Sequence, residues 1–176
     1  METKRNSKIF KTVLAGLLTA VLAVCSQLVV TTPFGIPLTL QIFAVALSGC
    51  VLGAKWSAAT VAVYIILGAF GLPVFSGFKG GLQVLFGAGG GFIIGFIFIG
   101  FFVGLAYKSK KVYFKFLFSI TGLLICHLIG VIQFSLIAGI DFLTAFLSVS
   151  FPFILKDIVL ILLSFKFAKY INKRLL

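Results

Sequence analysis

The feature that most constrains the fold is a long segment without charge near the start of the chain. No Asp, Glu, Lys or Arg occurs between Lys11 and Lys55. A charge near the centre of a bilayer costs roughly 2.5 kcal/mol or more on insertion scales, so charges mark the ends of membrane spans. The segment is too long for one span of about 20 residues, and Thr31–Pro37, with two prolines and a glycine, interrupts it. It therefore predicts two membrane-spanning helices joined by a tight hairpin.

The composition supports a membrane protein and excludes two other classes. The chain is 61% hydrophobic and 10% charged, whereas soluble domains are about a quarter charged. The net charge of +12 would suit a nucleic-acid-binding protein, but 22 Phe and long uncharged runs cannot lie against a phosphate backbone. We therefore predict an all-α, polytopic membrane protein, formed by residues 1–176 as a single integral membrane domain. Its surroundings are the lipid bilayer, and no nucleic acid is expected as a partner.

Further apolar stretches predict the remaining spans. Uncharged runs cover 56–78, 80–107 and 116–140, and a last stretch from about 144 to 165 is interrupted by Lys156-Asp157. At about 20 residues per span this predicts six transmembrane helices, or five if one segment is re-entrant. The expected helices cover approximately residues 9–30, 37–54, 56–72, 84–107, 115–139 and 144–167.

The positions of the basic residues predict the orientation. In a six-helix arrangement, 13 of the 15 basic residues fall on one side of the membrane. By the positive-inside rule that side is cytoplasmic, and both termini lie on it. The two exceptions are Lys79, in an outer loop, and Lys156, inside the last span.

Few residues could support catalysis or metal binding. His127 is the only histidine, and no carboxylate pair or Ser-His-Asp arrangement is visible. We interpret His127 as an interior group with a satisfied hydrogen bond, and the three cysteines as buried apolar residues. No G-x-x-x-x-G-K-[ST] phosphate-binding motif occurs, so ATP-driven work requires a partner. The chain is thus predicted not to be an enzyme and to hold no metal or cofactor.

Lys156-Asp157 is the strongest local indication of a binding site. Ionisable residues within a span are costly and face a cavity or each other. One interpretation is a ligand site that offers an ammonium and a carboxylate, and the other is an ion pair that only stabilises the bundle. Pro152 precedes the pair and is expected to widen the helix there.

Other polar and aromatic residues extend this candidate site. Gln41 and Gln133 lie in apolar runs, and each is either a ligand contact or an interhelical hydrogen bond. The glycine-rich segments 77–81 and 87–91 suit a loop folded into the outer mouth of the bundle, where backbone groups line a cavity. Three aromatic residues around this loop could form an apolar slot: Phe75, Phe78 and Phe92.

Four ordered motifs resemble those of the biotin transporter BioY family. Ile36–Gln41 is similar to V-P-I-T-L-Q, and Leu67–Phe75 to L-G-A-x-G-L-P-V-F. Gly80-Gly81 with Gly87–Phe92 resembles G-P-T-G-G-Y, and Phe151–Asp157 resembles P-F-x-x-x-D. The motifs span nearly all of the chain beyond the first predicted helix.

The resemblance implies the substrate-capture (S) component of an energy-coupling factor transporter in a bacterial plasma membrane. Such a component binds biotin, as transported ligand, from outside. Its implied partners are a transmembrane coupling subunit and two cytoplasmic ATPase subunits. The positions that match the family motifs are expected to line the biotin site: Thr39, Gln41, Phe75, Lys79, Gly81, Gly90, Gly91, Phe92, Lys156 and Asp157. The alternative is an S component for a different small vitamin or metabolite.

The chain departs from the family pattern at several positions. Ala88, Gly89 and Phe92 stand where the motif has Pro, Thr and Tyr. Leu160 occupies a position where many relatives carry Lys, so Lys156 is inferred to supply the cation. The family's A-x-x-x-A coupling motif in helix 1 has no strict match. Small residues at a similar spacing are the candidates for docking the coupling subunit: Ala15, Gly16, Thr19, Ala20 and Ala23.

Overall fold

The computed structural model describes residues 7–30 and 38–175, and it is dominated by helices. Two short strands, β1 (Val29–Val30) and β2 (Leu38–Thr39), pair antiparallel with Val29 opposite Thr39. They flank the predicted hairpin at 31–37, which lies outside the described residues. The helices in chain order are α2 (Lys8–Gln27), α3 (Gln41–Leu52), α4 (Ala54–Ala69), α5 (Leu82–Leu85), α6 (Gly90–Lys108), α7 (Val112–Ala138), α8 (Phe142–Val149) and α9 (Phe151–Leu175).

The helical membrane architecture predicted from the sequence is confirmed. Within the described residues, α2, α6 and α7 are each long and apolar enough to cross a membrane, and α8 with α9 passes the same test as a bent pair. The apolar helices α3 and α4 are shorter, with 12 and 16 residues. The chain is a multi-pass membrane protein, while six spans and cytoplasmic termini stay predictions.

Two predicted helices are divided in the structure. The expected helix 84–107 begins only at Gly90, and the short helix α5 and a turn precede it. The expected helix 144–167 is split into α8 and α9, which meet at 46°. Pro152 is the second residue of α9, a position where its missing N–H is not needed, so it starts a helix instead of widening one.

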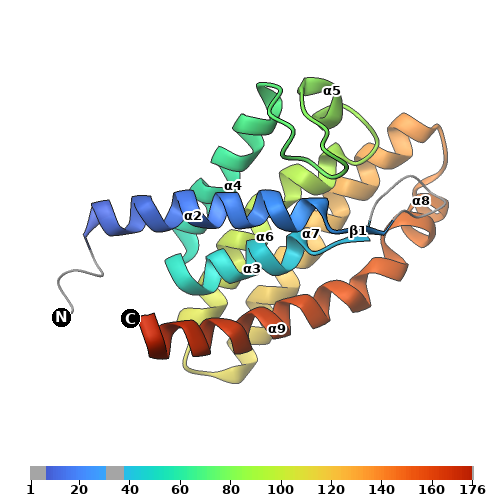
Figure 1. Ribbon diagram of the computed structural model, residues 1–176. Coiled ribbons are helices and arrows are strands. Elements are labelled where there is room, and N and C mark those ends of the chain that lie inside the picture. The colour runs from blue at the N-terminus through green and yellow to red at the C-terminus, as the bar shows by residue number, and fades with distance from the viewer. Residues whose placement is uncertain (1–6, 31–37, 176) are drawn as a thin grey trace.

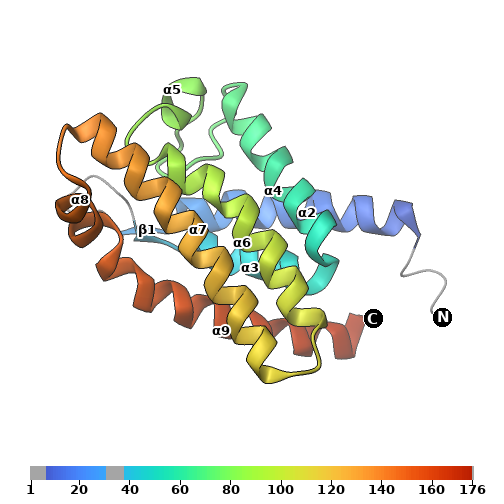
Figure 2. The same cartoon turned by 180° about the vertical axis from the view of Figure 1, so that it is seen from behind.

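Most of the basic clusters gather at one end of the bundle (Figure 1, Figure 2). The start of α2, the α3–α4 junction, the α6–α7 connection and the end of α9 all lie there. The opposite end holds α5, α8 and the strand pair. This arrangement matches the predicted separation of charge, because lysines flank each of those four places.

Glycines permit close helix packing in the centre. A Cβ added at Gly49 of α3 would lie 2.8 Å from the Gly100 carbonyl oxygen and 2.9 Å from the Gly104 amide nitrogen of α6. Those are backbone atoms, so the helices could not accommodate a side chain without moving apart. Gly100 and Gly104 stand at G-x-x-x-G spacing, and together with Gly49 they serve close helix packing here.

A capped turn connects α7 to α8. Gly139 adopts a left-handed conformation, φ 67°, at the end of α7. The Asp141 carboxylate then accepts hydrogen bonds from the Thr144 hydroxyl at 2.7 Å and the Thr144 amide at 2.8 Å. These hydrogen bonds favour the charged form and lower the pKa of Asp141. The sharp turn positions α8 across the end of the bundle opposite the lysine clusters.

Candidate ligand-binding site

A cavity of about 420 Å³ lies where the starts of α3, α6 and α9 meet the middle of α7 and the glycine-rich loop. Its lining combines apolar walls with a few converging polar groups, which is the usual composition of a small-molecule site. It brings together most of the residues predicted from the family motifs: Thr39, Gln41, Phe75, Lys79, Phe92, Lys156 and Asp157.

Three predicted glycines do not line this cavity, although each supports it. Gly81 has φ 96° and donates its amide hydrogen bond to the Gly68 carbonyl at 2.6 Å. A Cβ at Gly90 would overlap the Leu85 carbonyl, and one at Gly91 would lie 2.6 Å from the Ile129 carbonyl oxygen. These glycines allow backbone segments to approach each other, and the neighbouring residues of 87–89 line the cavity instead.

Lys156 and Asp157 form a direct ion pair at the cavity wall. The Lys156 Nζ lies 2.7 Å from Asp157 Oδ1, with side-chain exposures of 28% and 5%. Lys156 also lies 3.5 Å from the Thr39 carbonyl oxygen and 5.6 Å from the centre of the Phe153 ring. The structure is therefore compatible with both interpretations, because Lys156 and Asp157 form an ion pair and that pair also faces the cavity.

His127 completes this cluster from α7. Its Nε2 lies 3.2 Å from Asp157 Oδ2, and its Nδ1 lies 2.7 Å from the Ser150 hydroxyl at the α8–α9 junction. A carboxylate oxygen can only accept, so Nε2 carries a proton and donates a hydrogen bond to Asp157. In the tautomer with its proton on Nε2, Nδ1 accepts a hydrogen bond from the Ser150 hydroxyl, so both ring nitrogens have partners.

Sequence reasoning placed His127 in the interior correctly but left it out of the site. The available signal was the cost of an isolated polar group within a span, which favours pairing with another such group. Asp157 is the one carboxylate predicted inside a span, so it was the natural partner for His127. The Ser150 contact carried no comparable signal, because it depends on the break between α8 and α9.

A second chain of polar side chains begins at the cavity and runs away from it into the bundle. The Thr39 hydroxyl donates to Gln41 Oε1 at 2.8 Å, and Gln41 Nε2 donates to the Tyr64 hydroxyl at 2.8 Å. The Tyr64 hydroxyl donates in turn to the Val74 carbonyl at 2.9 Å. Thr39, Gln41 and Tyr64 are all buried. Gln41 therefore lines the cavity and also links α3 to α4. Tyr64 was not identified as part of this cluster from the sequence.

Hydrogen bonds from two helices hold the glycine-rich loop. At the end of α2, Gln27 Nε2 donates to the Phe75 carbonyl at 3.1 Å and Gln27 Oε1 accepts from the Phe78 amide at 2.8 Å. From α7, Gln133 Nε2 donates to the Leu85 and Gly87 carbonyls, both at 2.7 Å. Gln133 thus acts on the loop backbone, which is the interhelical alternative considered for it.

Two aromatic rings that line the cavity pack directly against glycines. The Phe75 ring fills the space that a Cβ would take at Gly68, and the Phe92 ring does the same at Gly130. Phe75 is fully buried. Phe78, expected in the slot, instead has φ 56° and points outward with 73% of its surface exposed.

Metal binding finds no support in this part of the molecule. Across 7–30 and 38–175, no three His, Cys, Asp or Glu side chains are grouped as metal ligands would be. The cluster of His127, Lys156 and Asp157 instead offers a charged acceptor and a charged donor beside aromatic walls.

Comparison with known proteins places the chain in a family. The family model described as BioY family matches residues 1–176. The chain belongs to the BioY family. Similar proteins include the biotin transporter BioY of Thermotoga maritima, with 45% identity over 66% of this chain and 69% of that protein. The biotin transporter BioY2 of Lactococcus lactis is 34% identical over 88% of this chain and 86% of that protein.

A solved structure shares the fold of this BioY-family chain. It is described as the S-component for biotin from an ECF-type ABC transporter. The TM-score is 0.84, and the match covers 96% of this chain and 94% of that one at 23% identity. The helical arrangement in Figure 1 is thus that of a known membrane S component.

Replacing Gln133 with Met tests how the loop is held. The substitution removes two hydrogen bonds, each contributing about 0.5–1.5 kcal/mol net, so local opening should rise about tenfold or more. Hydrogen exchange of the amides in 85–91 measures this opening. Gln83→Met is the matched control, because the Gln83 amide donates only to the Gly80 carbonyl in its own turn. Equal exchange in both variants would show that other contacts hold the loop.

Proposed function

We propose that this BioY-family chain is the biotin-binding membrane subunit of an ATP-driven energy-coupling factor transporter. The observation that carries the proposal is the cavity in which the motif residues converge on the buried Asp157 carboxylate. The names of the curated relatives and the shared S-component fold point to the same ligand.

The chemistry of biotin fits the two ends of this cavity. Its ureido group presents N–H donors, and its fused rings are largely apolar. Asp157 Oδ1 contacts the Lys156 ammonium but accepts no hydrogen bond from another described residue, so it can accept one from the ureido group. The rings would then lie between Phe92 and Phe75.

The ligand carboxylate requires a cation that is not already neutralised. Lys156 is paired with Asp157, whereas no carboxylate among the described side chains lies within ion-pair distance of the Lys79 ammonium. Lys79 is exposed at the cavity edge, where its backbone pairs with that of Phe75 in an isolated antiparallel bridge. We therefore assign the carboxylate to Lys79 and the ureido group to Asp157.

The α2 helix provides a surface for the coupling subunit. The small residues of α2 lie on two faces of the helix. One face, formed by Ala15, Thr19 and Ala23, is turned toward the bundle, and the Thr19 hydroxyl donates to the Ala15 carbonyl at 2.9 Å. Gly16 and Ala20 are exposed, and nothing lies within 4 Å of a Cβ built at Gly16. The Gly16–Ala20 pair is therefore the part of α2 that a helix of the coupling subunit could approach closely.

Asp157→Asn should weaken biotin binding at least tenfold, because a charge-assisted hydrogen bond contributes roughly 1.5–3 kcal/mol. Titration calorimetry of the purified protein in detergent measures the affinity. Asp141→Asn is the control, since Asp141 is exposed and caps α8 far from the cavity lining. Unchanged affinity in a folded Asp157→Asn protein would remove Asp157 from the site. Stoichiometric copurification of another vitamin, seen by native mass spectrometry, would favour an S component for that ligand.

Lys79→Gln should abolish the preference for biotin over its methyl ester. The wild-type protein should bind the acid more tightly, because only the acid pairs with an ammonium. The same competition titration applied to Lys55→Gln, a loss of charge at the other end of the bundle, should retain the preference. If Lys79→Gln still discriminates, the carboxylate is held by Lys156.

Replacing Gly16 and Ala20 with Leu should separate coupling from ligand binding. Biotin affinity should change less than about twofold, since neither residue lines the cavity. Copurification with the coupling subunit should fall about tenfold or more, because bulky side chains prevent close helix approach. Leu124→Phe, an enlargement on the exposed face of α7, is the control. An intact complex in the double variant would place the coupling surface elsewhere.

A further inference from the structure

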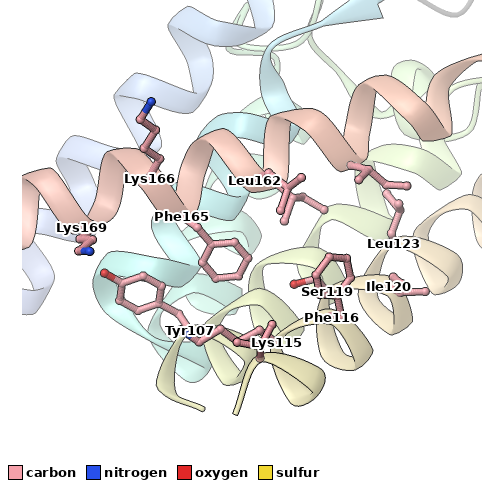
Figure 3. Close-up of a pocket in the computed structure, with 13 residues that line it drawn as sticks. Tyr107, Lys115, Phe116, Ser119, Ile120, Leu123, Leu162, Phe165, Lys166 and Lys169 are labelled. Carbon is pink, nitrogen blue, oxygen red and sulfur yellow. The ribbon is translucent and has the colours of Figure 1, made fainter. Parts of the chain in front are cut away.

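A second cavity of about 680 Å³ lies between the first half of α7 and the middle of α9. It shares no lining residue with the candidate biotin site. Figure 3 shows Phe116, Ile120 and Leu123 on one side and Leu162 and Phe165 on the other. We refer to it as the α7–α9 groove. Ile120 and Leu162 are 42% and 49% exposed, so the groove opens to the apolar surroundings of the bundle.

Polar groups occur at one end of the α7–α9 groove. Lys115 from α7 and Lys169 from α9 line it there, together with Tyr107. Lys166 also borders the groove, but in Figure 3 its ammonium lies on the side of α9 away from Tyr107 and Phe165. Because α7 begins and α9 ends at the lysine-rich end of the bundle, we expect these ammonium groups to lie near a membrane interface.

The Ser119 hydroxyl is an unexplained polar group inside this groove. It is 8% exposed, and its oxygen has no hydrogen-bond partner among the described residues. Figure 3 draws this oxygen on the side that faces the Phe165 ring. Ser119 lies four residues after Lys115, so it is about 6 Å further into the membrane along the helix axis. A hydroxyl without a partner in hydrocarbon is costly, which indicates a ligand atom there.

We propose that the α7–α9 groove binds one anionic phospholipid. The phosphate lies between Lys115 and Lys169, an ester carbonyl of the glycerol accepts a hydrogen bond from Ser119, and an acyl chain covers Leu123, Leu162 and Phe165. The order of charge, hydroxyl and apolar surface along the groove matches the order of groups in a phospholipid. A soluble anion would leave the apolar walls and the Ser119 hydroxyl without a partner.

Native mass spectrometry of the full chain in detergent tests this assignment. The probes are phosphatidylglycerol, phosphatidylcholine with the same acyl chains, and inorganic phosphate. One phosphatidylglycerol should bind with about tenfold preference, since each lysine near the interface attracts an anionic headgroup. Lys115→Gln with Lys169→Gln should weaken this binding about tenfold or more. Lys110→Gln with Lys111→Gln removes the same charge from residues outside the groove lining and should change it less than about twofold. Ser119→Ala should weaken it about threefold.

Three outcomes would overturn the proposal. Equal losses in the two lysine pairs would mean diffuse attraction to the surface charge. Binding of inorganic phosphate as tight as that of the lipid would show that the groove walls contribute nothing. A photoreactive residue at Leu162 that crosslinks to a protein subunit in the cell membrane, and not to lipid, would assign the groove to that subunit.

Discussion

The candidate site depends on a carboxylate that is buried in an apolar helix bundle. Asp157 is 4% exposed, and a charge in such surroundings persists only when partners compensate for the water it loses. One partner is its neighbour Lys156 on α9, and the other is His127, which comes from α7. Ser150, at the α8–α9 junction, orients His127 in turn. The carboxylate thus joins α7, α8 and α9 at one wall of the cavity.

The loop that borders the cavity is held by hydrogen bonds from neutral side chains to its backbone carbonyls. Ser26 and Tyr64 both donate to the Val74 carbonyl, at 2.6 and 2.9 Å, and Gln133 holds the carbonyls further along the loop. Irregular backbone at membrane depth must be satisfied by neighbouring side chains, since hydrocarbon offers no hydrogen bonds. The backbone of the glycine-rich loop is therefore part of the packed structure, while the side chains of Phe78, Leu82 and Phe86 are exposed.

The two cavities use charge differently. In the candidate biotin site, Asp157 and Lys156 neutralise each other, so a ligand meets polar groups without a large net charge. The α7–α9 groove carries ammonium groups without a nearby carboxylate among its lining residues. The basic residues that give the net charge of +12 therefore differ in where they lie in the structure. Most lysines gather at one end of the bundle, whereas Lys79 lies at the edge of the candidate site, where we propose that it binds the ligand carboxylate.

Residue patterns along the chain were sufficient for the class of the fold and for many of the residues that line the candidate cavity. The charge-free runs indicated helices because burying a charge in hydrocarbon is costly wherever it occurs. The ordered motifs indicated Thr39, Gln41, Phe75, Lys79, Phe92 and the Lys156-Asp157 pair, which line one cavity. These features depend on local composition and spacing, which a sequence displays directly.

Only the tertiary structure decided how polar groups pair across the bundle. His127 meets Asp157, and Gln41 meets Tyr64, because helices distant in the chain pack closely. Gly90 and Gly91 matched a binding motif, yet their lack of a Cβ serves the approach of Leu85 and Ile129. The break at Ser150 did have a signal in Pro152, which starts α9 but was interpreted as widening one continuous helix. By itself, the sequence determined where charge is tolerated, because that cost is local. Which polar groups contact each other depends on how the helices pack, and only the three-dimensional fold establishes that packing.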